Sequence, residues 1–225
     1  MTISTVRHQP IFDPAKYSYL PITIVGAGAT GSRVFMSLVE LGLTNIVVYD
    51  DDIVEPHNLA NQAYTHAHIG SPKVKALQLL YHAKCGQLPP HSMEFKQERV
   101  TDQQLEGMVF LLTDTMSSRR EIIGNQSFDG VLRVFETRMA STHGNVYSFN
   151  PHLSAERDAW FNSLIDDDQA EVSPCGSPIS VGPTASLIAN LVVWEFMNYC
   201  LGNCHSGQID AYFKPMMLCT KEALA

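Results

Sequence analysis

The sequence predicts an α/β fold: a Rossmann-like, doubly wound and mainly parallel sheet with an elaborated C-terminal half. Two observations predict it. Short runs rich in β-branched residues alternate with helix-like segments up to about residue 137, and the first of these runs passes directly into a glycine-rich turn. Strands that alternate with helices are joined by crossovers, which make the strands parallel and place helices on both faces of the sheet.

The first half supplies the alternating elements in order. Val34, Leu38 and Leu41 recur at helical spacing, and Gly42 offers a stop. Ser71 is the expected N-cap of the next helix, with Pro72 in its first turn. The expected strands are 21–26, 45–50, 92–100, 108–114 and 130–137, and the expected helices are 30–43, 71–83 and 117–126.

The second half is less regular, and the whole chain, 1–225, is expected to form one domain. Pro10 and Pro14 prevent a long helix in residues 1–20, which we expect to be an N-terminal arm. Acids, prolines and glycines in 166–183 predict a long mobile loop. The remaining elements expected are a strand at 144–151, a helix over about 184–200 and a strand at 208–218.

Composition excludes several classes of protein. Of the 225 residues, 45% are hydrophobic and 17% charged, and the formal net charge is -8, so non-specific binding to nucleic acid or anionic membranes is not expected. No run of 18 apolar residues and no signal sequence is found. The five cysteines contain no CxxC pair, which argues against a disulfide framework and against zinc and favours the cytoplasm.

The segment "IVGAGATGSRV" places Gly26, Gly28 and Gly31 in a GxGxxG pattern between the first strand and the first helix. The first glycine permits a tight turn, the second lets a phosphate approach the backbone, and the third lets helix and strand pack closely. Asp50 ends the second strand, at the distance along the chain where an acid can hold ribose hydroxyls. These residues fit NAD and ATP equally well.

Three adjacent acids follow the second strand in "VVYDDDIVEPHNLANQ". In an extended segment Asp50 and Asp52 point to one side and Asp51 to the other. We therefore expect two acids to face the pocket and one to face solvent.

Four ordered blocks, "GAGATGS", "VVYDDDIVEPHNLANQ", "IGSPKVKAL" and "LLTDTMSSRRE", resemble the ThiF/MoeB/HesA-like family, the bacterial relatives of ubiquitin-activating enzymes. The family pattern is a glycine turn, then D-x-D-x-V-x-x-x-N-L-x-R-Q, then G-K-x-K, then T-D-x-x-x-x-R. The resemblance covers about residues 21 to 137. The matching positions are Asp50, Asp52, Val54, Asn58, Leu59, Gln62, Gly70, Lys73, Asp114 and Arg119.

The resemblance implies ATP-dependent adenylation of the C-terminal carboxylate of a ubiquitin-like or sulfur-carrier protein, or of a peptide. This chemistry needs positioned cations more than a general base, because the nucleophile is already an anion. By resemblance, Lys73 contacts the phosphates, Asp114 holds Mg²⁺ and Asp50 holds the ribose. The remaining cofactor-binding residues that it implies are Asp52, Asn58, Gln62 and Arg119.

The chain departs from the family pattern at one position, where Asn61 replaces an arginine that contacts ATP phosphate in relatives. Two other cations are candidates to substitute. Arg7 lies on the N-terminal arm, where relatives often carry an arginine that reaches into a partner subunit, and this predicts a homodimer. Arg33 lies just after the glycine turn.

Cys175 lies in the expected loop, in the region where some relatives place a thioester-forming or persulfide-accepting cysteine. A chance loop cysteine is the alternative. Two other functions also stay open: a catalytically impaired scaffold subunit, favoured by Asn61, and an NAD-dependent oxidoreductase. Simpler roles remain for single residues: Lys73 as a solvated lysine, Asp114 as a helix cap, and Arg119 in a surface ion pair.

Overall fold

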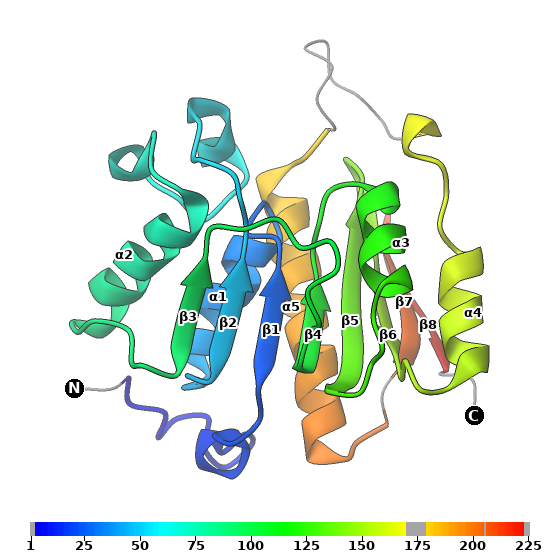
Figure 1. Cartoon of the computed structure of the whole chain (residues 1–225), viewed down its shortest axis with the longest axis horizontal. Coiled ribbons are helices and arrows are strands. Elements are labelled where there is room, and N and C mark those ends of the chain that lie inside the picture. Colours follow the sequence, from blue (N-terminus) through cyan, green and yellow to red (C-terminus); the bar gives the residue numbers. More distant parts are fainter. Residues whose placement is uncertain (1–2, 170–178, 205, 223–225) are drawn as a thin grey trace.

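A computed structural model describes residues 3–169, 179–204 and 206–222, and its strands form one sheet of eight (Figure 1). The order across the sheet is β3-β2-β1-β4-β5-β6-β7-β8. The strands are β1 Ile22–Val25, β2 Ile46–Tyr49, β3 Met93–Lys96, β4 Gly107–Leu111, β5 Val131–Met139, β6 His143–Phe149, β7 Ser206–Phe213 and β8 Met216–Glu222.

Strands β1 to β5 pair in parallel, and β5 to β8 continue the same sheet in antiparallel pairing. The chain leaves β1 toward β2 and β3 on one side and returns to β4 on the other side. In open α/β sheets the crevice at such a reversal, outside the carboxyl ends of the strands, is where ligands bind. The expected mainly parallel α/β fold with an elaborated second half is confirmed.

Helices cover both faces of the sheet (Figure 1). Buried residues of α1, α2 and α5 belong to one hydrophobic cluster, and those of α3 and α4 to a second. The helices are α1 Gly31–Glu40, α2 Lys73–Cys85, α3 Met116–Gly124, α4 Ser154–Asn162 and α5 Gly182–Leu201. The molecule is therefore a three-layer α/β/α structure in which the sheet is the central layer.

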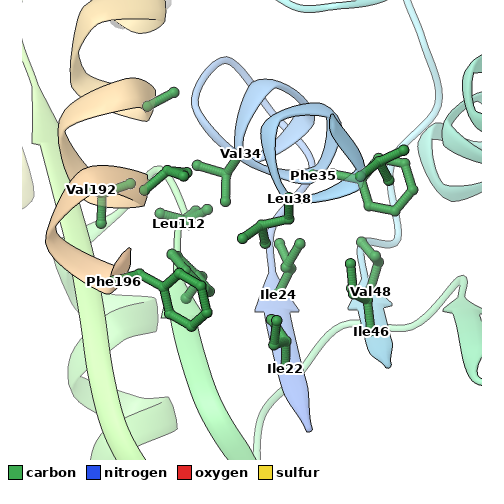
Figure 2. Close-up of a cluster of buried hydrophobic side chains, with 14 of the residues drawn as sticks. Ile22, Ile24, Val34, Phe35, Leu38, Ile46, Val48, Leu112, Val192 and Phe196 are labelled. Carbon is green, nitrogen blue, oxygen red and sulfur yellow. The ribbon is translucent and has the colours of Figure 1, made fainter. Parts of the chain in front are cut away.

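The alternation of side chains along each strand divides the core between the two faces. Ile22 and Ile24 of β1 pack in the cluster of α1 and α5, whereas Val25 packs in the cluster of α3. Figure 2 shows Ile24 beneath Leu38 of α1, with Phe196 of α5 beside this group. Both faces of β1 are buried, as the continuous apolar run in the sequence predicts.

Three expected elements differ in extent. The strand expected over 92–100 covers only Met93–Lys96, at the edge of the parallel part of the sheet. Helix α2 begins at Lys73, because Pro72 has an extended conformation and bridges to Ile53, so Ser71 is not its N-cap. Within the expected loop 166–183, a short 3-10 turn covers Asp167–Gln169 and α5 already begins at Gly182, while 170–178 lie outside the described residues.

Two elements were not expected from the sequence. Helix α4 is mostly polar and buries only Glu156 and Trp160, so it has no continuous apolar stripe to recognise. The single strand expected over 208–218 is a hairpin of β7 and β8 that turns at Lys214 and Pro215. Its second strand exposes Met216 and its neighbours at the edge of the sheet, so burial does not mark it in the sequence.

Among the described residues, no helix combines the length and the apolar character needed to cross a membrane.

Candidate functional site

The glycine turn follows β1 at the topological reversal and combines two tightly packed glycines with one open glycine. Gly26 has φ +96, and a Cβ there would lie 2.7 Å from the carbonyl oxygen of Leu112. A Cβ on Gly31 would collide with the carbonyl group of Gly26. No heavy atom lies within 4 Å of the Cβ position of Gly28. The turn is thus held against the end of β4 and leaves space above its middle glycine, as a phosphate cradle requires.

The turn is fixed on both sides of Ala27. The N–H of Ala27 donates to Oδ2 of Asp50 over 2.6 Å, and the carbonyl oxygen of Ala27 accepts from the hydroxyl of Tyr64 over 2.7 Å. Burial, with smaller contributions from Asp50 and Asp52, raises the pKa of Tyr64 well above its ordinary value, so the phenol stays a hydrogen-bond donor. The acid-rich segment after β2 therefore shapes the turn after β1.

Lys73 lies between the two acids predicted to share a side. Its Nζ is 2.7 Å from Oδ2 of Asp52 and 4.0 Å from Oδ1 of Asp50. Its side chain is only 8% exposed, so the interpretation of Lys73 as a solvated first-turn lysine is wrong. Asp51 is exposed, and Asp50 and Asp52 both lie beside Lys73, although the Asp52 side chain remains 65% exposed; that the two acids face a pocket stays a prediction.

The buried position of Asp50 disfavours its charged carboxylate form. Burial raises its pKa above the ordinary value, against the opposing effects of Lys73 and of the N–H groups of Ala27 and Asp52. Both carboxylate oxygens already accept backbone hydrogen bonds, from Ala27 and from Asp52. Asp50 is therefore an anchor of the glycine turn, whatever else it binds.

Asn58 and Gln62 lie on a 3-10 turn, Pro56–Ala60, and just after it. Asn58 is buried, and its Oδ1 accepts the N–H of Glu55 over 2.9 Å, which closes a capping box. Oδ1 of Asn61 and Oε1 of Gln62 are buried and have no hydrogen-bond partner in the described structure. Such atoms are satisfied by water or by a ligand.

Asp114 lies beyond the carboxyl end of β4, exposed and without a hydrogen bond from the described residues. It does not cap α3, since Thr115 accepts from the N–H of Ser118, and Asp167 accepts from the N–H groups of Met116 and Ser117. The interpretation of Asp114 as a helix cap is therefore wrong. Its exposed carboxylate interacts electrostatically with Arg119 but accepts no hydrogen bond from the described residues.

Arg119 is buried and is not the surface ion pair that the simpler interpretation expects. Its guanidinium donates to the carbonyl oxygens of Thr113 and Thr137 and lies 3.1 Å from Oε1 of Glu136, which is fully buried. Burial lowers the pKa of Arg119, and Glu136 opposes this effect. In this structure Arg119 holds the carbonyl group that immediately precedes Asp114.

The other predicted residues lie apart from this group. Arg7 is exposed on the N-terminal arm, whose Thr5 and Pro14 pack against Gly42 just beyond the end of α1. Helix α1 begins at the glycine turn and is about 15 Å long, so Arg7 lies far from the turn of its own chain. Cys175 falls outside the described residues.

The residues present fit a triphosphate with one Mg²⁺. Within the described ranges, no group of three or more His, Cys, Asp or Glu side chains is arranged to hold a metal ion. A magnesium ion held by Asp114 would therefore take its remaining oxygen ligands from phosphates and water, which is the usual coordination of Mg²⁺ in nucleotide sites. The ends of β2 and β4 are two strands apart, about 10 Å, so Lys73 and Asp114 flank the glycine turn.

Sequence reasoning missed Tyr64, Ser32 and Glu136. Oγ of Ser32 accepts the N–H of Ala63 over 3.0 Å and, with Tyr64, joins this segment to the glycine turn. No pattern in the sequence marks these two contacts. Glu136 had a signal, because it lies with two arginines inside the otherwise apolar strand "VLRVFETRM", where charges must be paired.

Comparison with known proteins gives a family and a fold. The model of the ThiF family matches residues 15–220. A search of curated protein sequences finds no match.

Several solved structures have the same fold. One is that of PaaA, with a TM-score of 0.73, 14% identity and 98% of this chain covered. Others are of MccB from E. coli, one with AMPCPP and MccA (TM-score 0.69) and one with ATP (0.68), each 12% identical and covering 93% of this chain. The chain spans 69% of the PaaA chain and 65% to 66% of these MccB chains.

Proposed function

This chain belongs to the ThiF family, and from that premise we propose that it is an ATP-dependent adenylyltransferase. Its substrate would be the C-terminal carboxylate of a peptide or of a ubiquitin-like or sulfur-carrier protein, and Mg²⁺ would be required. The observation that carries the proposal is the arrangement at the reversal between β1 and β4. There, an open glycine turn lies between the buried Lys73 and the exposed carboxylate of Asp114.

In the proposed reaction a carboxylate oxygen of the substrate attacks the α-phosphorus of ATP. The bond from that phosphorus to the bridging oxygen breaks, and pyrophosphate leaves with the electron pair. No proton is transferred, so no general base is needed. The protein would contribute position and compensating charge: the glycine turn and the N-terminus of α1 would face the phosphates, and Asp114 would hold Mg²⁺, whose charge would favour departure of pyrophosphate.

The solved structures of MccB support a nucleotide and a second substrate, since they include complexes with ATP and with AMPCPP together with MccA. An NAD-dependent oxidoreductase would leave the Lys73–Asp52 pair and the exposed Asp114 without a role. Two further parts of the proposal are a homodimer in which Arg7 enters the partner's site, and thioester formation on Cys175.

Exchange of labelled pyrophosphate into ATP, measured with candidate peptides and carrier proteins, tests the proposal. Exchange that depends on an acceptor carboxylate and is lost in Asp114→Ala is the expected result. ATP binding without exchange for any acceptor would instead indicate the scaffold alternative that Asn61 favours. The exposed Asp129→Ala is the matched control, since Asp129 lies at the opposite end of the strands, just before β5.

A further inference from the structure

Arg33, in the first turn of α1, carries a positive charge with no acid beside it. Its side chain is half-buried, and it forms no ion pair with any of the described residues. Its Nε donates to the carbonyl oxygen of Asn61 over 3.4 Å, which leaves both terminal amino groups of the guanidinium for another partner. Burial lowers the pKa of Arg33, and no carboxylate of the described residues opposes this effect.

Lys73 and Arg119, the two other cations considered for this site, each have a carboxylate partner. Lys73 lies between Asp50 and Asp52, and Arg119 pairs with Glu136. A buried or half-buried charge is stabilised by a partner of opposite sign, and an anion provides one when the protein does not. Of these three side chains, Arg33 is thus the one that has no carboxylate partner among the described residues.

Arg33 is also close to the open part of the glycine turn. The N–H of Ser32 donates to the carbonyl oxygen of Gly28, and that of Arg33 to the carbonyl oxygen of Thr30, both over 3.1 Å, so the helix begins directly from the turn. Beside Arg33, the buried oxygens of Asn61 and Gln62 lack partners within the described structure. Within residues 3–169, 179–204 and 206–222, the guanidinium therefore has terminal amino groups without a hydrogen-bond partner, next to a carbonyl oxygen that it already contacts.

We propose that Arg33 binds the phosphate groups of ATP and supplies the positive charge that the side chains around the glycine turn otherwise lack. The inference rests on the proposed function, because it assumes ATP at this site. A guanidinium forms two parallel hydrogen bonds to phosphate oxygens, and the two free amino groups of Arg33 allow this geometry. Arg33 follows the glycine turn by only two residues and is part of the same site.

The test is equilibrium binding of Mg-ATP and of adenosine, by calorimetry, to the wild type and to Arg33→Ala, Arg33→Gln and Arg33→Lys. Adenosine has no phosphate, so it reports on the fold and on the nucleoside pocket alone. We expect Arg33→Ala and Arg33→Gln to bind ATP about 10- to 100-fold more weakly and adenosine as the wild type does. Arg33→Lys keeps the charge without the planar fork, and we expect an intermediate loss of ATP affinity.

Three results distinguish the alternatives. Wild-type protein that binds no ATP would remove the proposed function itself. ATP binding that is unchanged in Arg33→Ala would overturn the role of Arg33 and leave the function standing. If Arg33→Gln binds ATP like the wild type while Arg33→Ala does not, Arg33 only holds the Asn61 carbonyl, and the inference is wrong. Lys75→Ala, which removes an exposed charge from α2, is the matched control and should bind both molecules normally.

Discussion

The carboxylate of Asp50 and the backbone N–H of Ala27 are joined by a hydrogen bond of 2.6 Å. This bond connects the end of β2 to the turn that follows β1, and it places a buried acid directly under the glycine turn. The same carboxylate accepts the N–H of Asp52 and lies 4.0 Å from Lys73. The acid-rich segment is thus part of the framework that shapes the glycine turn.

Replacing Asp50 with alanine tests this framework. The change leaves the N–H groups of Ala27 and Asp52 without their acceptor and removes one of the two acids beside Lys73, so we expect a loss of about 2–3 kcal/mol in the free energy of unfolding. Urea unfolding measures it. Asp51→Ala removes the adjacent exposed acid and should change the stability by less than about 0.5 kcal/mol. Equal effects of the two changes would contradict the anchoring role of Asp50.

Asp167 tests whether the segment before residue 170 is tied to α3. Its carboxylate accepts from the N–H groups of Met116 and Ser117, so Asp167→Ala removes a cap, and we expect a loss of about 0.5–1 kcal/mol. Asp168→Ala, one residue further along and also exposed, is the control. Thermal unfolding of both variants measures the difference.

The contribution of Asp167 should depend on pH. A hydrogen bond from the Ser117 side chain, followed by the backbone donors, lowers the pKa of Asp167 below its ordinary value of 3.8. A lowered folded pKa means that the stabilisation is complete above the unfolded pKa and is lost as the pH falls through the folded value. The difference in the free energy of unfolding between the wild type and Asp167→Ala should therefore disappear as the pH falls below about 4. A stability difference that stays constant down to about pH 2 would show that the cap does not depend on the charge of Asp167.

Reactivity of the cysteines tests the packing of the end of α5. Burial raises the pKa of Cys200 to about 12, whereas Cys204 and Cys219 are exposed. Only the thiolate reacts with a disulfide reagent, so at about pH 8 Cys200 should react far more slowly than the exposed pair. Both variants are made in protein that carries Cys175→Ser. There, Cys200→Ser should leave the amplitude of the fast phase of thiol labelling unchanged, and Cys204→Ser should reduce it. Fast labelling of Cys200 would mean that this end of α5 opens readily.

The sequence predicts the centre of the parallel half well because β1 and β4 are buried on both faces, which gives continuous apolar runs, whereas the edge strand β3 is only partly buried and shorter than expected. Helix α4 and strand β8 could not be predicted in the same way. Trp160 and Glu156 are the only buried residues of α4, and the exposed edge strand β8 has no alternation of polar and apolar residues. In both elements tertiary contacts, and not local pattern, decide the structure.

In the candidate site, too, local geometry could be predicted from the sequence, whereas contacts between distant segments could not. The order of residues along the chain predicts that Asp50 and Asp52 share a side, because strand geometry fixes it. It does not predict that Lys73 is buried between them or that Tyr64 reaches the carbonyl of Ala27, since both contacts join segments across the fold. The burial of Arg119 on α3 could not be predicted either, because its partner Glu136 lies on a separate element, strand β5.

Glu136 provides the sharpest test of how the buried charges support the site. It is fully buried and accepts from Arg138 and from the indole N–H of Trp160, besides pairing with Arg119. In Glu136→Gln the two buried arginines lose their common counter-charge, and we expect a loss of about 3–5 kcal/mol in the free energy of unfolding. Chemical unfolding measures it, with the exposed Glu121→Gln on α3 as the control.

The same variant should also reduce pyrophosphate exchange at temperatures where it remains folded. Arg119 holds the carbonyl oxygen of Thr113, the residue before Asp114. When Arg119 loses Glu136, the position of Asp114 is less fixed, and if Asp114 holds the metal as proposed, misplacement by about 1 Å lowers the rate by up to about 100-fold. If Glu136→Gln is destabilised but exchanges at the wild-type rate while folded, Glu136 serves the stability of the sheet alone and does not position Asp114.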